Sequence, residues 1–133
     1  MDYKFLMDKA LEARKKSYSP YSHFCVGAAL LCKNGKVYTG CNIENAAYTP
    51  TNCAERTAIF KAVSEGEREF EAIAIVGGRE NEPGGFCAPC GVCRQVIAEF
   101  CDKDFKIVLG SADGITVYTL GDMLPHSFGK ANL

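Results

Sequence analysis

Three cysteines and one glutamate are the residues whose types and spacing could do chemistry. Cys53 and Glu55 stand two positions apart, and Cys90 and Cys93 follow as a Cys-x-x-Cys pair. Three thiolates can hold a tetrahedral zinc ion with its fourth position open, whereas a closed structural site takes four protein ligands. A carboxylate beside such a site could accept a proton from bound water and pass it to a leaving amine. The pattern therefore predicts a catalytic zinc centre with Glu55 as its proton-transfer group.

Each part of this pattern has a simpler interpretation. The Cys-x-x-Cys pair alone would suit a zinc ribbon, a redox pair or an iron–sulfur cluster. A ribbon needs a second such pair, which the sequence lacks, and a ferredoxin-type run would need a cysteine where Ile97 stands. Asn52 could cap a helix whose third residue is Glu55, the capping-box position. The short separation of Glu55 from a metal thiolate favours the catalytic interpretation.

The charge of such a centre needs compensation. Three thiolates outweigh the charge of zinc and weaken its ability to acidify water. Arg56 could offset this by hydrogen-bonding to a thiolate sulfur, and Arg94 is a weaker candidate for the same role. Cys87 could compete as a ligand, but a spare thiol in a flexible loop is the preferred interpretation. His23 and His126 lack metal spacing to the cysteines. The remaining cysteines are interpreted as core or interface thiols: Cys25, Cys32, Cys41 and Cys101.

Composition narrows the class of protein. A chain of 133 residues is predicted to form one domain, residues 1–133, with a real hydrophobic core. Its 15 basic and 16 acidic residues give a net charge of −1, so neither nucleic acid nor an anionic membrane would attract it. No apolar run approaches the ~18 residues of a membrane span, and no signal-peptide pattern is present. Free or metal-bound cysteines then suit a cytoplasmic protein.

The apolar pattern predicts an α/β layered sheet in which both cysteine groups begin helices. A helix N-terminus stabilises a thiolate, and two N-termini facing each other could place three sulfurs around one ion. Asn34-Gly35 is a strong hairpin signal. The predicted elements are helices at 3–17, 53–65, 91–101 and 120–124, strands at 24–33, 36–42, 72–76, 105–109 and 115–119, and a loop at 77–88.

Several motifs together resemble the small zinc-dependent cytidine deaminases. They are Tyr18–Ser22, Phe24–Leu30, Gly40–Tyr48 and the two cysteine motifs, and the resemblance as a whole covers nearly the whole chain. The resemblance implies a three-layer α/β/α fold with a five-stranded mixed sheet, assembled as a homotetramer with one zinc ion per subunit. It also implies hydrolytic deamination of cytidine and deoxycytidine, with release of ammonia, in pyrimidine salvage. Glu55 would protonate N3 and then carry a second proton to the leaving ammonia.

The resemblance also implies a set of substrate contacts. One aromatic residue would pack on the pyrimidine, two polar residues would bind the ribose 3′-hydroxyl, and backbone groups would meet the base carbonyl and the leaving amino group. Two further aromatic residues would complete the pocket across subunit boundaries. In that order the residues are Phe24, Asn42 and Glu44, Ala54 N–H and the Ala88 carbonyl, and Tyr48 and Phe128.

Two departures and three rival functions accompany this resemblance. Ala88 stands where serine is usual, although a backbone role would survive that change, and the loop at 77–88 is a few residues longer than common. The rivals are a deaminase of cytosine in DNA or RNA, a deaminase of another cytosine-like nucleoside, and a non-enzymatic zinc module. A polynucleotide deaminase would need a basic groove with stacking aromatics, and the net charge argues against that.

Overall fold

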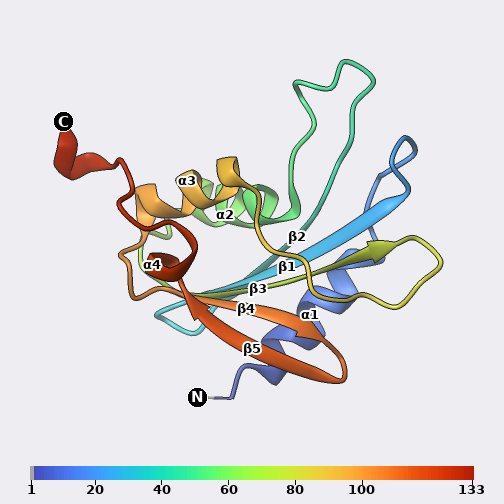
Figure 1. Ribbon diagram of the computed structural model, residues 1–133, viewed down its shortest axis with the longest axis horizontal. Coiled ribbons are helices and arrows are strands. Elements are labelled where there is room, and N and C mark those ends of the chain that lie inside the picture. The colour runs from blue at the N-terminus through green and yellow to red at the C-terminus, as the bar shows by residue number, and fades with distance from the viewer. Residues whose placement is uncertain (1) are drawn as a thin grey trace.

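A five-stranded mixed sheet forms the centre of the structure, a computed structural model that describes residues 2–133 (Figure 1). The strand order is β2-β1-β3-β4-β5, in which β3 and β4 are parallel and the other neighbours antiparallel. The elements in chain order are α1 (Lys4–Arg14), β1 (Phe24–Cys32), β2 (Val37–Cys41), α2 (Ala54–Ser64), β3 (Phe70–Arg79), α3 (Gly91–Phe100), β4 (Lys106–Ser111), β5 (Gly114–Thr119), α4 (Leu120–Met123) and a 3-10 turn (Lys130–Asn132).

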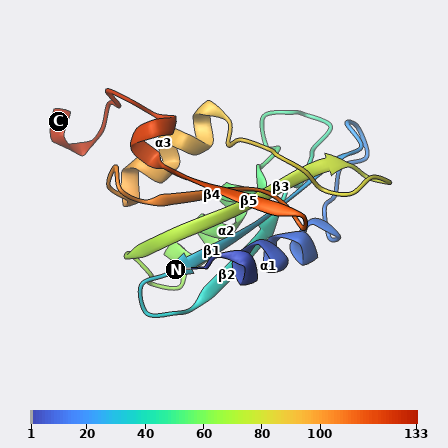
Figure 2. The ribbon, with the colours of Figure 1, turned by 60° about the horizontal axis from the view of Figure 1, so that its bottom comes forward.

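Helices cover both faces of this sheet, which confirms the three-layer prediction. Helix α1 lies on one face and helices α2 and α3 lie on the other, as the two views show (Figures 1 and 2). Alternate residues of each strand therefore enter different cores. On β3, Ile73 and Ile75 pack towards α2 and α3, whereas Ala72, Ala74 and Val76 pack towards α1. The smaller side chains let α1 lie close to the sheet.

Most of the predicted elements are confirmed. The hairpin turns at Asn34-Gly35, where Gly35 has a φ of +91° and the Asn34 side chain accepts a hydrogen bond from the Lys36 N–H. Helices α2 and α3 begin and end within one residue of the predicted bounds, and Gly66 follows α2 with a φ of +98°. No helix within residues 2–133 has the length and apolar character to cross a membrane.

The first helix is shorter than predicted. Helix α1 ends at Arg14, not at residue 17. After it, the chain pairs with the segment that follows β2: the Tyr18 N–H donates to the Asn42 carbonyl, and the Glu44 N–H donates to the Tyr18 carbonyl. These long-range hydrogen bonds take the place of a further helical turn. The spacing of apolar residues in the sequence could not predict them, because their partners lie in a distant segment.

The predicted loop at 77–88 is wrong in its first part. Strand β3 continues to Arg79, with Gly77 opposite Val26 and Gly78 opposite Cys25 on β1. Gly77 also exchanges backbone hydrogen bonds with Gly85, which folds the rest of the segment back against β3. Glycine is required at position 77 because a Cβ atom there would lie 2.9 Å from the Cys87 sulfur. The glycines thus mark a close approach within a strand.

A second close approach occurs between α1 and β1, and it predicts a large effect of a single methyl group. A Cβ atom at Gly27 would lie 2.0 Å from the Ala10 carbonyl oxygen and 2.5 Å from the Arg14 nitrogen. Both are helix backbone atoms, so Gly27→Ala must displace α1. We expect a loss of about 3 kcal/mol in the free energy of unfolding, measured by urea denaturation. Gly114→Ala, which meets nothing within 4 Å, is the control; equal stability of the two variants would contradict this packing.

Candidate active site

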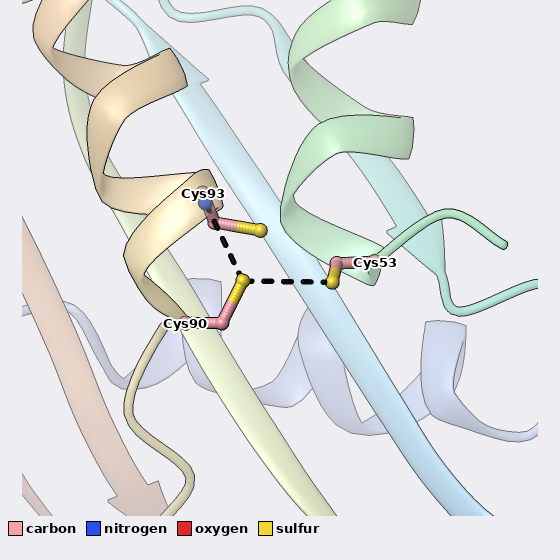
Figure 3. A group of neighbouring side chains, drawn as sticks. All are labelled: Cys53, Cys90 and Cys93. Carbon is pink, nitrogen blue, oxygen red and sulfur yellow. Dashed lines mark hydrogen bonds between the residues drawn. The ribbon is translucent and has the colours of Figure 1, made fainter. Parts of the chain in front are cut away.

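The three cysteines predicted to bind metal lie together at the beginnings of two helices (Figure 3). Cys53 directly precedes α2, Cys90 directly precedes α3, and Cys93 lies in the first turn of α3. Their sulfur atoms all lie within 4.8 Å of one another, and those of Cys53 and Cys90 are 3.9 Å apart. Tetrahedral zinc with bonds of about 2.3 Å requires sulfur atoms about 3.8 Å apart. The cluster therefore fits zinc.

The cluster offers three ligands and one open side. No fourth Cys, His, Asp or Glu from the described part of the chain joins the group. Cys93 is buried, Cys53 is half-buried and Cys90 is exposed, so the site is accessible from solvent. Three ligands with an accessible fourth position are the arrangement of a catalytic zinc centre rather than a structural one.

The sheet determines where the first of these ligands lies. Helix α2 rests directly on β2, where a Cβ atom at Gly40 would lie 2.6 Å from both the Ala54 carbonyl oxygen and the Ala58 nitrogen. Only glycine allows this contact between helix backbone and strand. Because Cys53 immediately precedes α2, the same contact sets the distance of its sulfur from α3.

Hydrogen bonds favour the thiolate form of Cys53. The Cys93 thiol lowers the pKa of Cys53 most, Arg56 lowers it further, and burial opposes both, so that the pKa falls to about 5. The Arg56 Nη2 atom donates to the Cys53 sulfur at 3.2 Å, as the sequence predicted. The Nε atom of the same guanidinium is buried and has no hydrogen-bond partner within residues 2–133. The arginine therefore stabilises the Cys53 thiolate first through this hydrogen bond and then through its charge.

Glu55 is a buried carboxyl group beside the sulfur cluster. Its side chain lies in the first turn of α2, and the residue is only 4% exposed. Burial raises the pKa of Glu55 to about 7, and the Cys53 charge acts in the same direction, whereas the helix N-terminal amide opposes them. A carboxyl group with a pKa near neutrality can both accept and donate a proton.

The capping-box interpretation of Glu55 is wrong. The residue before α2 is Cys53 rather than Asn52, so Glu55 is the second residue of the helix and not the third. The Asn52 side chain instead donates to the Thr57 hydroxyl. Glu55 is therefore not paired with Asn52 in a capping box.

Other candidates near the cluster have different roles. Arg94 does not bind a sulfur: its guanidinium donates to the carbonyl groups of Pro89 and Met123, which ties the start of α3 to α4. Cys87 lies outside the metal group but is not a loose thiol, because it packs half-buried against the core beside Gly77. Burial raises the pKa of Cys87 to about 11. His23 and His126 are not part of the group either.

Comparison with known proteins shows which family this chain resembles in sequence and fold. The family model for the cytidine and deoxycytidylate deaminase zinc-binding region matches residues 1–109. A cytidine deaminase from Sporosarcina psychrophila is 51% identical over 134 residues, which cover 100% of this chain and 96% of the relative. The chain belongs to the cytidine deaminase family. The crystal structure of the cytidine deaminase from Burkholderia pseudomallei superposes with a TM-score of 0.87 at 48% identity, covering 96% of this chain and 100% of that one.

The cytidine deaminase motifs place several predicted substrate residues close together. Phe24 begins β1 and is 39% exposed, and its ring lies next to Cys87, since both would touch a Cβ atom at Gly77. Asn42 is bound to the same strand: its Nδ2 atom donates to the Phe24 carbonyl at 2.8 Å, and its Oδ1 atom accepts from the Val26 N–H at 2.9 Å. An aromatic face and an amide group thus adjoin at the beginning of β1.

Glu44 is held near the start of β1 by the segment that precedes that strand. Its carboxylate accepts hydrogen bonds from the Tyr21 and Ser22 N–H groups and, at 2.5 Å, from the Ser22 hydroxyl. The Ser22 hydroxyl contributes most to lowering the pKa of Glu44, so the group stays ionised at neutral pH. Glu44 and Tyr48 line one pocket.

The two remaining aromatic residues are exposed in the single chain. Tyr48 is 76% exposed and has a φ of +64°, and Phe128 is 59% exposed. The segment that contains Tyr48, between β2 and α2, projects from the sheet, and the C-terminal segment extends away beyond α3 (Figure 1). Neither segment is covered by the rest of the chain.

Sequence reasoning missed two serines that hold Asn42 and Glu44, the polar residues predicted to bind substrate. The Ser22 hydroxyl binds Glu44, and the Ser17 hydroxyl lies 2.5 Å from the Asn42 Oδ1 atom. Ser22 belongs to a quoted motif, but its type gives no sign of its partner. Ser17 was included in the predicted first helix. Only the long-range pairing after β2 brings it to Asn42.

Proposed function

We propose that the protein hydrolyses free cytidine and 2′-deoxycytidine to uridine and 2′-deoxyuridine with release of ammonia. The observation that carries this proposal is the buried Glu55 carboxyl beside a three-thiol cluster with an open side. Zinc, when bound by Cys53, Cys90 and Cys93, supplies a water molecule acidified towards neutral pH.

Glu55 moves the protons of the reaction. Its carboxylate accepts a proton from the attacking water and delivers it to N3 as the oxygen bonds to C4. It then carries the second proton of that water to the amino nitrogen, and the C4–N bond breaks to release ammonia. A pKa near 7 suits both directions of transfer. Arg56 holds the Cys53 sulfur throughout.

The family motifs and the residues near the cluster support a set of proposed substrate contacts. Phe24 packs on the pyrimidine, and the Ala54 N–H, an unpaired donor at the start of α2, meets the base carbonyl. The backbone carbonyl of Ala88, an exposed residue that precedes α3, receives the leaving amino group. Asn42 donates to the ribose 3′-hydroxyl, and the ionised Glu44 accepts from it.

The oligomeric state and the cellular compartment are also part of the proposed function. We propose a homotetramer in which Tyr48 and Phe128 reach the pocket of a neighbouring subunit, because both are large aromatic side chains on uncovered segments. Each subunit, one domain of residues 1–133, binds one zinc ion. The protein acts in pyrimidine salvage in the cytoplasm, where a reducing environment keeps the three ligand thiols available for metal.

Conversion of free cytidine, followed by ultraviolet absorbance beside a cytosine-containing oligonucleotide, tests the proposed substrate. We expect rapid loss of cytidine and 2′-deoxycytidine and none of the oligonucleotide, because a chain with a net charge of −1 offers no electrostatic attraction to a polynucleotide. Protein stripped of metal serves as the control. Activity on the oligonucleotide alone would assign the protein to the polynucleotide deaminases, and silence on all substrates with zinc bound would favour another nucleoside or a structural role.

A further inference from the structure

Ser17 is a polar residue that the proposed reaction has not used. It follows α1 and is half-buried, and its hydroxyl lies near three oxygen atoms: Asn42 Oδ1 at 2.5 Å, Ser19 Oγ at 3.2 Å and the Asn42 carbonyl at 3.4 Å. A serine hydroxyl has one proton to donate. The shortest contact is to Oδ1, so Ser17 donates to the Asn42 side chain.

With this hydrogen bond, all but one of the hydrogen-bonding positions of the Asn42 amide have partners. The Oδ1 atom accepts from the Ser17 hydroxyl and from the Val26 N–H, which occupies both of its lone pairs. One Nδ2 hydrogen goes to the Phe24 carbonyl. One N–H therefore remains, and the orientation of the amide determines where it points.

Ser17 also contacts a buried neighbouring residue on the side of the protein interior. The neighbouring Ser19 is buried, with its hydroxyl 3.2 Å from that of Ser17 and 3.3 Å from the Cys25 sulfur. This row of hydroxyl and thiol groups runs from the interior to Asn42. The contact with Ser19 limits the movement of the Ser17 oxygen, and the shorter contact to Asn42 Oδ1 is the one to which Ser17 donates.

We propose that Ser17 is a positioning residue that acts through Asn42 and sets the preference of the enzyme for nucleosides with a ribose 3′-hydroxyl. This inference rests on the proposed function, in which the free N–H of Asn42 donates to that hydroxyl. Without Ser17, one lone pair of Oδ1 becomes free in a half-buried place. The amide then keeps only its bonds to Val26 and Phe24, and its remaining N–H is held less firmly towards the substrate.

The test compares Ser17→Ala with the wild-type enzyme on cytidine and on 3′-deoxycytidine. A hydrogen bond of ordinary strength corresponds to about a fivefold to tenfold effect. We expect kcat/KM for cytidine to fall by roughly that factor, mainly through KM, while kcat/KM for 3′-deoxycytidine changes less than about twofold. Ser17→Thr, which keeps the hydroxyl, should restore discrimination. Ser64→Ala, a serine that only caps the end of α2, is the matched control.

A double-mutant cycle shows whether Ser17 acts through Asn42. If it does, adding Ser17→Ala to Asn42→Ala produces no further loss on cytidine. Equal losses on both nucleosides, or independent effects of the two substitutions, would overturn the positioning role. A wild-type enzyme that ignores the 3′-hydroxyl would instead refute the Asn42 contact on which it rests, and one inactive on cytidine would refute the proposed function.

Discussion

Glu55→Gln is expected to abolish nearly all turnover of cytidine while leaving the metal in place. The amide keeps the shape of the side chain but cannot exchange protons with water, N3 and the leaving amine. Loss of such general acid–base catalysis lowers kcat by about 10²- to 10⁴-fold. Zinc content should stay at that of the wild type, because Glu55 is not part of the sulfur group. Glu55→Ala should also keep its zinc.

The measurement pairs steady-state kinetics with metal analysis of the same preparations. Glu99→Gln, an exposed substitution on α3, is the matched control for the change of charge and should retain full activity. The thermal stability of Glu55→Gln should equal or exceed that of the wild type, because burial disfavours the charged form of the native residue. Near-normal turnover would remove Glu55 from the mechanism.

Cys90→Ala is expected to lose both zinc and stability. Only two sulfurs would remain, and one of them, Cys53, would lose its neighbour at 3.9 Å. A ligand present at a thousand times its Kd stabilises the folded state by about 4 kcal/mol, and the variant forfeits a contribution of that order. Metal analysis and urea denaturation measure the two effects.

Two comparisons make this result specific to the metal. Cys101→Ala, at a half-buried thiol outside the group, should keep its zinc whatever it does to packing. Wild-type protein treated with a chelator should be about as unstable as Cys90→Ala, and the chelator should have no effect on the variant. Full zinc content in Cys90→Ala would show that Cys87 replaces the lost ligand, and the double variant would then identify it.

Local chemistry in the sequence was sufficient for the metal group. Cys53 was predicted at a helix start because Thr49-Pro50-Thr51-Asn52 introduces a helix, and the structure places both Cys53 and Cys90 directly before a helix. Asn34-Gly35 predicted the hairpin in the same way. In each case the residues that determine the conformation lie within a few positions of one another.

Contacts between segments that lie far apart in the sequence could not be predicted from local residue patterns. The glycines at 77 and 78 read as a loop, although they lie in β3 opposite β1. Ser17 read as helix, although a segment 25 positions away holds its hydroxyl. Asn52 and Glu55 matched a capping box by spacing, but the helix begins one residue later. The spacing of residue types does not show which of two local options long-range pairing will select.

Two of the metal-binding cysteines lie far apart in the sequence, and this separation matters for when the metal site can form. Cys53 and Cys90 are 37 positions apart, and all of β3 lies between them. In the folded chain the sulfurs meet where α2 and α3 pack on the same face of the sheet, in which β3 pairs with β1. A chain still emerging from the ribosome therefore cannot complete its metal site before β3 and the start of α3 have been synthesised.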